Sequence, residues 1–178
     1  MRALVVYESM YGNTHVIAAS IADGLRSTHE VTLVPAAKAT RGLIADADLV
    51  VAGGPTHMHG MSRRTTRRAA AKQESGLELD PDAGGPGIRE WLKDVTGGHG
   101  ITAAAFDTRH TGIPFLTGRA SHGIAQLLQQ HGFLLLAAPE SFLIGQRNTL
   151  LDDEAARARQ WGATLGTTAS HGYALAGT

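Results

Sequence analysis

The stretch Tyr7-Glu8-Ser9-Met10-Tyr11-Gly12-Asn13-Thr14 decides the fold of this chain. The apolar run 3–7 leads into it, and Ile17, Ile21 and Leu25 follow it at intervals of four residues. An apolar run, a short polar turn and apolar residues at helical spacing indicate a strand, a tight turn and the start of a helix. The sequence therefore predicts a strand–turn–helix unit at its N-terminal end.

The turn of this unit has the properties of a phosphate site. The free N–H groups of the first helical turn and the positive end of the helix dipole both point toward it. Such a helix start binds phosphate without needing Lys or Arg. Short polar side chains add donors, and Gly12 lets the backbone bend around an anion. The predicted phosphate-binding residues are Ser9, Met10, Tyr11, Gly12, Asn13 and Thr14.

Other phosphate loops are excluded by their motifs. A Walker A loop ends in Gly-Lys-Ser/Thr, which is absent, and a dinucleotide fingerprint needs three glycines where Gly12 stands alone. A cysteine phosphatase loop needs a Cys, and the chain has none. The remaining pattern, Ser9-x-Tyr11-Gly12-Asn13-Thr14 after the first strand, resembles the FMN phosphate loop of the flavodoxin family. The alternative is an ordinary strand-to-helix turn capped by Asn13 or Thr14.

Strand and helix patterns alternate along the rest of the chain, which is typical of an α/β fold with a parallel sheet. We expect strands at 2–7, 31–35, 48–54, 101–107 and, interrupted at Pro139, at 133–138 with 141–144. We expect helices at 14–27, 36–45, 63–73, 88–95, 118–131 and 152–167, with an exposed insertion at 74–87. The resemblance implies a three-layer, doubly wound, flavodoxin-like parallel sheet of five strands in the order 2-1-3-4-5. Residues 1–178 then form one domain, in which 167–178 is a frayed tail.

In that strand order, the loops 8–14, 55–62 and 108–117 meet at one edge of the sheet. The second loop belongs to Gly53-Gly54-Pro55-Thr56-His57-Met58-His59-Gly60. A strand ending in Gly-Gly-Pro-Thr resembles the isoalloxazine loop of flavodoxins and of their quinone-reductase relatives. The resemblance implies FMN as the cofactor. Its ring would lie between two sets of residues: Pro55, Thr56, His57, Met58, His59 and Gly60 on one side, and Thr108, Arg109 and His110 on the other.

The two ring loops differ from the flavodoxin pattern in their side chains. Flavodoxins usually stack Trp or Tyr on the ring, whereas these loops offer histidines, and Phe115 is the remaining aromatic candidate. Neither loop contains Asp or Glu. His57 and His59 have no carboxylate nearby to complete a metal site, so we expect no metal. A hydrolase elbow, G-x-S-x-G, is also absent, and we assign no catalytic residue.

The overall composition limits the partners and the location. The chain has 16 Lys and Arg against 16 Asp and Glu, and this zero formal net charge argues against a nucleic-acid binder. Without Cys there is no disulfide and no thiolate nucleophile. The sequence begins directly in a strand pattern, with no recognisable signal peptide and no apolar run long enough to span a bilayer. We therefore expect a cytoplasmic protein, and the sequence does not indicate its oligomeric state.

Two functions follow from the resemblance. The first is an FMN-binding, flavodoxin-like redox protein that transfers electrons through a noncovalent flavin to or from a redox partner protein. The alternative is an NAD(P)H:quinone-type oxidoreductase that uses the same FMN site, with NAD(P)H and a quinone as its partners. A third interpretation is a flavin-free interaction module with the same fold.

One further feature is basic. The cations Arg63, Arg64, Arg67, Arg68 and Lys72 fall at helical spacing along one side of the predicted helix 63–73. One interpretation is a solvated face, partly balanced by the acids Glu74, Glu78, Asp80 and Asp82. The other is a docking patch beside the flavin, for an acidic redox partner or the phosphates of NAD(P)H.

Overall fold

The computed structural model describes residues 1–178 except 58, 74–76, 113–117, 146–147 and 177–178. The side chains of 71–73 and 172–176 are also outside the description. None of the helices in the described part of the chain has both the length and the apolarity that crossing a bilayer requires.

The sheet has central strands that are apolar and buried on both faces, and outer strands that are partly exposed. β1 (Arg2–Tyr7) pairs in parallel with β2 (Glu30–Pro35) and with β3 (Leu49–His57). β5 (Thr102–His110) pairs in parallel with β3, with β6 (Leu134–Leu135) and with β7 (Glu140–Ile144). Two short strands thus share the last position. An interruption that includes Pro139 is confirmed, but the strand predicted over 133–138 covers only 134–135. The order β2-β1-β3-β5-β6 confirms the doubly wound, flavodoxin-like α/β sheet.

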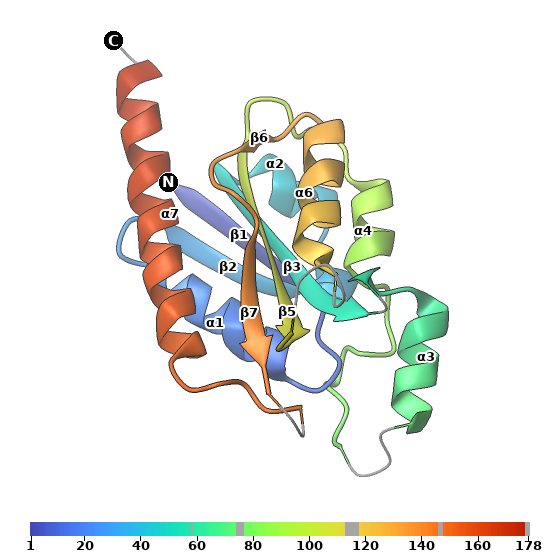
Figure 1. Ribbon diagram of the computed structural model, residues 1–178. Coiled ribbons are helices and arrows are strands. Elements are labelled where there is room, and N and C mark those ends of the chain that lie inside the picture. Colours follow the sequence, from blue (N-terminus) through green and yellow to red (C-terminus); the bar gives the residue numbers. More distant parts are fainter. Residues whose placement is uncertain (58, 74–76, 113–117, 146–147, 177–178) are drawn as a thin grey trace.

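Helices cover both faces of this sheet (Figure 1). On one face, α1 (Asn13–Leu25) and α7 (Glu154–Ala176) enclose an apolar cluster that includes Val5, Ile21 and Phe106. On the other face, α4 (Ile88–Asp94) and α6 (Ala120–Gln130) enclose a second cluster with Val6, Leu92 and Ile124. The short elements η1 (Ala36–Lys38) and α2 (Arg41–Ala45) add to this second cluster. α3 (Arg64–Gln73) lies outside the layers, beyond the carboxyl edge of the sheet (Figure 1).

The helices α1 and α7 pack very closely. Gly24 of α1 permits this approach, because a Cβ atom there would overlap the carbonyl oxygen of Arg159 and come within 2.7 Å of the backbone nitrogen of Ala163. Ile17, Ile21 and Leu25 of α1 are fully buried, as their four-residue spacing predicts. The first helix is therefore fixed by apolar packing along its whole length.

Four other predictions of local structure are wrong. β3 continues through Pro55 to His57, because a short strand, β4 (Gly60–Met61), folds back on it in an antiparallel hairpin. β5 likewise reaches His110, where the prediction ended the strand at 107. The helix predicted at 36–45 is split, since Thr40 starts α2 by accepting a hydrogen bond from Leu43 N. The frayed tail is helical as far as Ala176, and Ala169 within it is buried.

Candidate functional site

A cavity of about 480 Å³ opens at the carboxyl edge of the sheet, a volume typical of small-molecule sites. The three predicted loops meet there, as the strand order requires. Their lining residues are Met10, Tyr11, Asn13, Thr14, Pro55, Thr56, His57, Thr108, Arg109 and His110. The cavity is also lined by residues that the sequence did not indicate, namely Thr65, Thr66, Ala69, Ala70, Ile144 and Asn148.

The turn before α1 leaves the start of this helix open. Gly12 is the N-cap, with a φ of 89°, and no side chain caps the helix. The alternative of an ordinary turn capped by Asn13 or Thr14 is therefore wrong. Ser9 is buried and does not line the cavity, and its hydroxyl accepts a hydrogen bond from Gly12 N at 3.1 Å. This bond fixes the turn, and the positive φ explains why a glycine is required there.

The side chains of Asn13 and Thr14 tie the turn to other parts of the cavity. Thr14 Oγ1 is 2.7 Å from Thr108 Oγ1, which joins the first loop to the third. Asn13 Nδ2 donates to the backbone oxygen of Asn148 at 2.7 Å and to its side-chain oxygen at 3.2 Å. Asn148 has a left-handed backbone, with a φ of 56°. In the sequence, Asn148 is only an isolated Asn in a loop. Nothing there indicates that it contacts Asn13, which is 135 positions away.

The second loop is a hairpin rather than an open loop. Thr56 pairs with Met61, and His57 pairs with Gly60. Thr56 Oγ1 also accepts a hydrogen bond from Ala120 N, at the start of α6. His59, at the hairpin tip with a φ of 74°, is exposed, and neither it nor Gly60 lines the cavity. Met58 lies outside the described residues.

The charge of the ring loops comes from Arg109 rather than from His57. Burial lowers the pKa of His57, and the nearby charges of Arg67 and His110 lower it further, so His57 is neutral at pH 7. Arg109 is buried, and its Nη1 donates to the carbonyl oxygens of His110 and Gly112, each at 3.3 Å. Phe115 lies outside the described residues.

The carboxylate nearest in sequence to the third loop faces away from the turn of α1. Asp107 is fully buried and its Oδ2 accepts a hydrogen bond from Ser121 N at 2.7 Å, at the start of α6. In the part of the chain that the structure describes, no group of three or more His, Cys, Asp or Glu side chains is arranged to hold a metal ion.

The basic helix does not have a single solvated side, so that interpretation needs correction. Arg64 and Arg68 are exposed, but Arg67 is 5% exposed and turns inward. Two acids of the insertion are paired elsewhere: Asp80 Oδ2 lies 3.6 Å from His15 Nδ1, and Asp82 Oδ1 lies 3.0 Å from Lys38 Nζ. Glu74 lies outside the described residues. The sequence signal for a buried arginine was Glu8, because an acid that directly follows an apolar strand needs a partner if it is buried.

Comparison with known proteins finds a matching sequence family. Residues 5–91 match the sequence model of the flavodoxin family. This match covers just under half of the chain, and within it the chain is similar to flavodoxins. Among curated proteins, none matches the sequence significantly.

Solved structures of flavodoxins have the same fold as this chain. A flavodoxin from the domain Archaea matches with a TM-score of 0.67 and 18% identity, covering 96% of this chain and 100% of that chain. Flavodoxin 1 from Bacillus cereus matches with a TM-score of 0.64 and 18% identity, over 94% and 98% of the two chains. The flavodiiron protein from Giardia intestinalis matches with a TM-score of 0.66 and 22% identity, over 96% of this chain and 36% of that one.

FMN is the cofactor of flavodoxin-family proteins, and the residues of this cavity fit it. The start of α1 has no side-chain cap, which leaves its backbone N–H groups for a phosphate. Pro55, Thr56 and His57 on one strand, and Thr108 and Arg109 on the next, line the same cavity. The cavity thus offers an anion site and a separate wall for a flat ring.

Proposed function

We propose that this chain is an electron-transfer flavoprotein that binds FMN noncovalently in the cavity at the carboxyl edge. In this proposal the phosphate lies on the Ser9–Thr14 turn, and the ring lies between Pro55–His57 and Thr108–His110. The observation that carries the proposal is the meeting of the uncapped start of α1 with both ring loops in one cavity.

The bound flavin would supply the redox chemistry, and the protein would set its orientation and potential. The backbone N–H groups at the start of α1 would hold the phosphate, while Thr14 keeps that turn joined to Thr108. Arg109, which lines the cavity, would place a positive charge beside the ring. Such a charge stabilises a reduced, negatively charged flavin.

The proposed partner is an acidic redox protein. Arg63, Arg64 and Arg68 are exposed, and they lie at or just before the helix whose other residues line the cavity. This arrangement supports electrostatic steering of a negatively charged partner toward the flavin edge.

The test is a titration of the purified apo-protein with FMN and with riboflavin. We expect FMN to bind distinctly more tightly, since riboflavin lacks the phosphate. A protein that binds neither ligand would contradict the proposal and favour a flavin-free module.

A second measurement separates the carrier from the enzyme. A carrier should need an added reductase, or its physiological donor, before its flavin is bleached. Rapid anaerobic bleaching by NAD(P)H alone, followed by turnover of a quinone, would instead assign the chain to the NAD(P)H:quinone-type oxidoreductases.

A further inference from the structure

The α3 wall of the cavity has an unusual attachment. Thr65, Thr66, Ala69 and Ala70 of this helix line the cavity. Among the α3 side chains that the structure describes, 64–70, only Arg67 is buried. A helix of 10 residues is not stable alone in water, and an apolar face normally fixes it to the protein. In the described part of α3, a cation takes the place of that apolar face.

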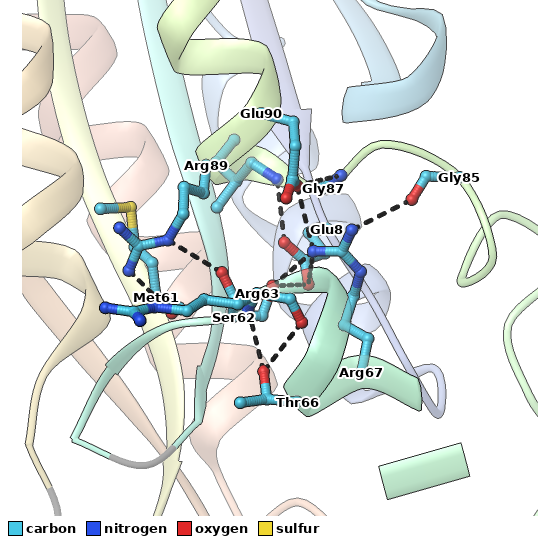
Figure 2. Close-up of polar contacts among 11 residues, drawn as sticks. Glu8, Met61, Ser62, Arg63, Thr66, Arg67, Gly85, Gly87, Arg89 and Glu90 are labelled. Atoms are coloured by element: carbon cyan, nitrogen blue, oxygen red, sulfur yellow. Dashed lines mark hydrogen bonds and ion pairs between the residues drawn. The ribbon is translucent and has the colours of Figure 1, made fainter. Parts of the chain in front are cut away.

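Arg67 makes polar contacts with several elements at once (Figure 2). Its Nη1 donates to Ser62 Oγ at 3.0 Å and to Glu90 Oε2 at 3.1 Å, and its Nη2 donates to the Gly85 oxygen at 3.4 Å. The same Nη1 lies 3.8 Å from Glu8 Oε1. A guanidinium with this many acceptors is well compensated for its loss of water.

Glu8 connects this cluster to the phosphate turn. It is the first residue after β1, and its backbone N–H donates to Gly53 O of β3 at 2.9 Å. Glu8 is only 5% exposed. Its carboxylate accepts a hydrogen bond from Ser62 Oγ and another, at 2.8 Å, from Ile88 N at the start of α4. The side chain therefore points away from the cavity while the backbone begins the turn that lines it.

The cluster is balanced in charge and filled in space. The carboxylates of Glu8 and Glu90 face the guanidinium of Arg67, and Arg89 donates to the backbone oxygens of Ser62 at 3.0 Å and Met61 at 3.0 Å (Figure 2). Gly87 leaves room for this arrangement, since a Cβ atom there would overlap the Glu8 carboxylate. These charged side chains therefore hold α3, α4 and the end of β1 in one relative arrangement.

We propose that Arg67 and Glu8 are positioning residues of the cofactor site, whose buried pair fixes α3 as a wall of the cavity and couples that wall to the phosphate turn. The inference rests on the proposed FMN function. It assigns a role in cofactor binding to two side chains that do not themselves line the cavity.

The test compares Arg67→Met with Arg68→Met, the same change at the exposed neighbouring position. Arg67→Met should weaken FMN by about ten- to a hundredfold, the range for losing a hydrogen-bonded charged partner. It should also speed hydrogen exchange of the α3 amides in the apo-protein. Arg68→Met should change neither property. Arg67→Lys, which retains the charge and can reach Ser62 and Glu90, should restore part of the affinity.

Glu8→Gln provides a second route if Arg67→Met does not fold. It keeps the shape of the side chain and removes its charge, so FMN should again bind more weakly. If both single variants fold, the double variant Glu8→Gln/Arg67→Met should lose less affinity than the sum of the single losses, because both act through one pair.

The outcomes separate this inference from the proposed function. A wild-type protein that binds no FMN contradicts the proposed function, and the exchange rates of α3 in the apo-protein still report whether Arg67 holds the helix. FMN affinity equal in folded Arg67→Met and Arg68→Met proteins would overturn the inference. Faster α3 exchange with unchanged FMN affinity would overturn it too, because the pair would then stabilise α3 without positioning the cofactor.

Discussion

Two helices line the same cavity, and different forces hold them in place. α1 reaches the cavity with Asn13 and Thr14, and its buried Ile17, Ile21 and Leu25 pack it between the sheet and α7. α3 reaches the cavity with threonines and alanines, and Arg67 is its one buried side chain among those described. Packing depends on shape and volume, whereas a buried ion pair depends on the charge of both partners. The two walls should therefore respond to different perturbations.

The largest effect should come from Gly24→Ala in the packed wall. Alanine normally favours a helix over glycine, but here the new methyl group overlaps backbone atoms of α7 that cannot move aside. We expect a loss of about 3 kcal/mol in the free energy of unfolding, measured with urea. The matched control is Gly42→Ala in α2, where the nearest atom that a Cβ would meet is Thr40 Oγ1 at 3.9 Å. That change should be neutral or stabilising by up to about 1 kcal/mol, and equal effects at both sites would remove the close-packing argument.

The next effect concerns cofactor binding at the start of α1. Thr14→Ala should weaken FMN by about 1–3 kcal/mol, as for a lost bond to a charged group, and it also removes the contact with Thr108. Gly12→Val should weaken FMN more. A Cβ at Gly12 meets no atom within 4 Å, so the reason is backbone strain at a φ of 89° rather than a collision. Titrations of the apo-proteins measure both losses. Unchanged FMN affinity in both variants would remove the phosphate assignment.

A smaller effect should appear in the redox potential of bound FMN. A charge about 4 Å from the reduced ring is worth about 1 kcal/mol even at the dielectric constant of water, which corresponds to tens of millivolts for one electron. Arg109→Glu should therefore lower the midpoint potential of the second electron by at least this amount. Potentiometric titration of wild type and variant measures it. Arg68→Glu on the α3 side is the control, and an equal shift there would mean that Arg109 acts only through overall charge.

The pH dependence of stability should report His57, which lines the same cavity as the two walls. Its folded-state pKa is lowered by burial and then by Arg67 and His110, so the unfolded chain binds more protons between that value and about 6.5. The contribution to stability is complete above pH 6.5 and is lost as pH falls through the lowered pKa. His57→Gln should make the free energy of unfolding depend less steeply on pH. Part of the dependence should remain, because burial also lowers the pKa of His29.

Urea unfolding between pH 7.5 and 5 measures that slope, and His122→Gln at an exposed position is the control. The Arg67→Met variant provides a second test. Removing the charge of Arg67 should raise the pKa of His57 and so reduce the pH dependence of stability. A slope that is the same in wild type and His57→Gln would contradict the assignment of a neutral His57.

The smallest effect should come from the exposed side of α3. Reversing Arg64 and Arg68 to Glu should change the free energy of unfolding by no more than about 0.5 kcal/mol, as is usual for surface positions, and should leave FMN binding intact. Electron transfer with an acidic partner should slow, and the difference should shrink as salt rises, because exposed charges are screened over about 10 Å at 0.1 M. Stopped-flow rates at two salt concentrations test this. Unaltered rates at low salt would assign these arginines to solvation alone.

Much of the packed wall could be predicted from the sequence. The spacing of Ile17, Ile21 and Leu25 gave the buried face of α1, and the Gly-Gly-Pro-Thr end of the third strand indicated where the second loop would lie. The meeting of the three loops followed from the strand order, which constrains where the carboxyl ends of parallel strands can be. These features depend on neighbours within a few positions, or on a general rule of topology.

The charged wall was decided by the tertiary structure. Arg67 looks like its exposed neighbours in the sequence, and its burial depends on Glu8, Ser62 and Glu90, which come from separate elements. The Glu8 carboxylate accepts a hydrogen bond from Ile88 N, 80 positions away, and the Asn13 side chain donates one to Asn148 O, 135 positions away. The hairpin that lengthens β3 likewise arises from pairing with Gly60 and Met61 rather than from strand propensity.

The sequence by itself therefore determined the α/β fold, the turn after the first strand and the helix that follows it, because the spacing of apolar side chains along the chain predicts which faces are buried. Only the tertiary structure decided which arginine is buried and which residues beyond the predicted loops line the cavity. A buried charge is stable only where partners converge around it, and that convergence is a property of the folded chain.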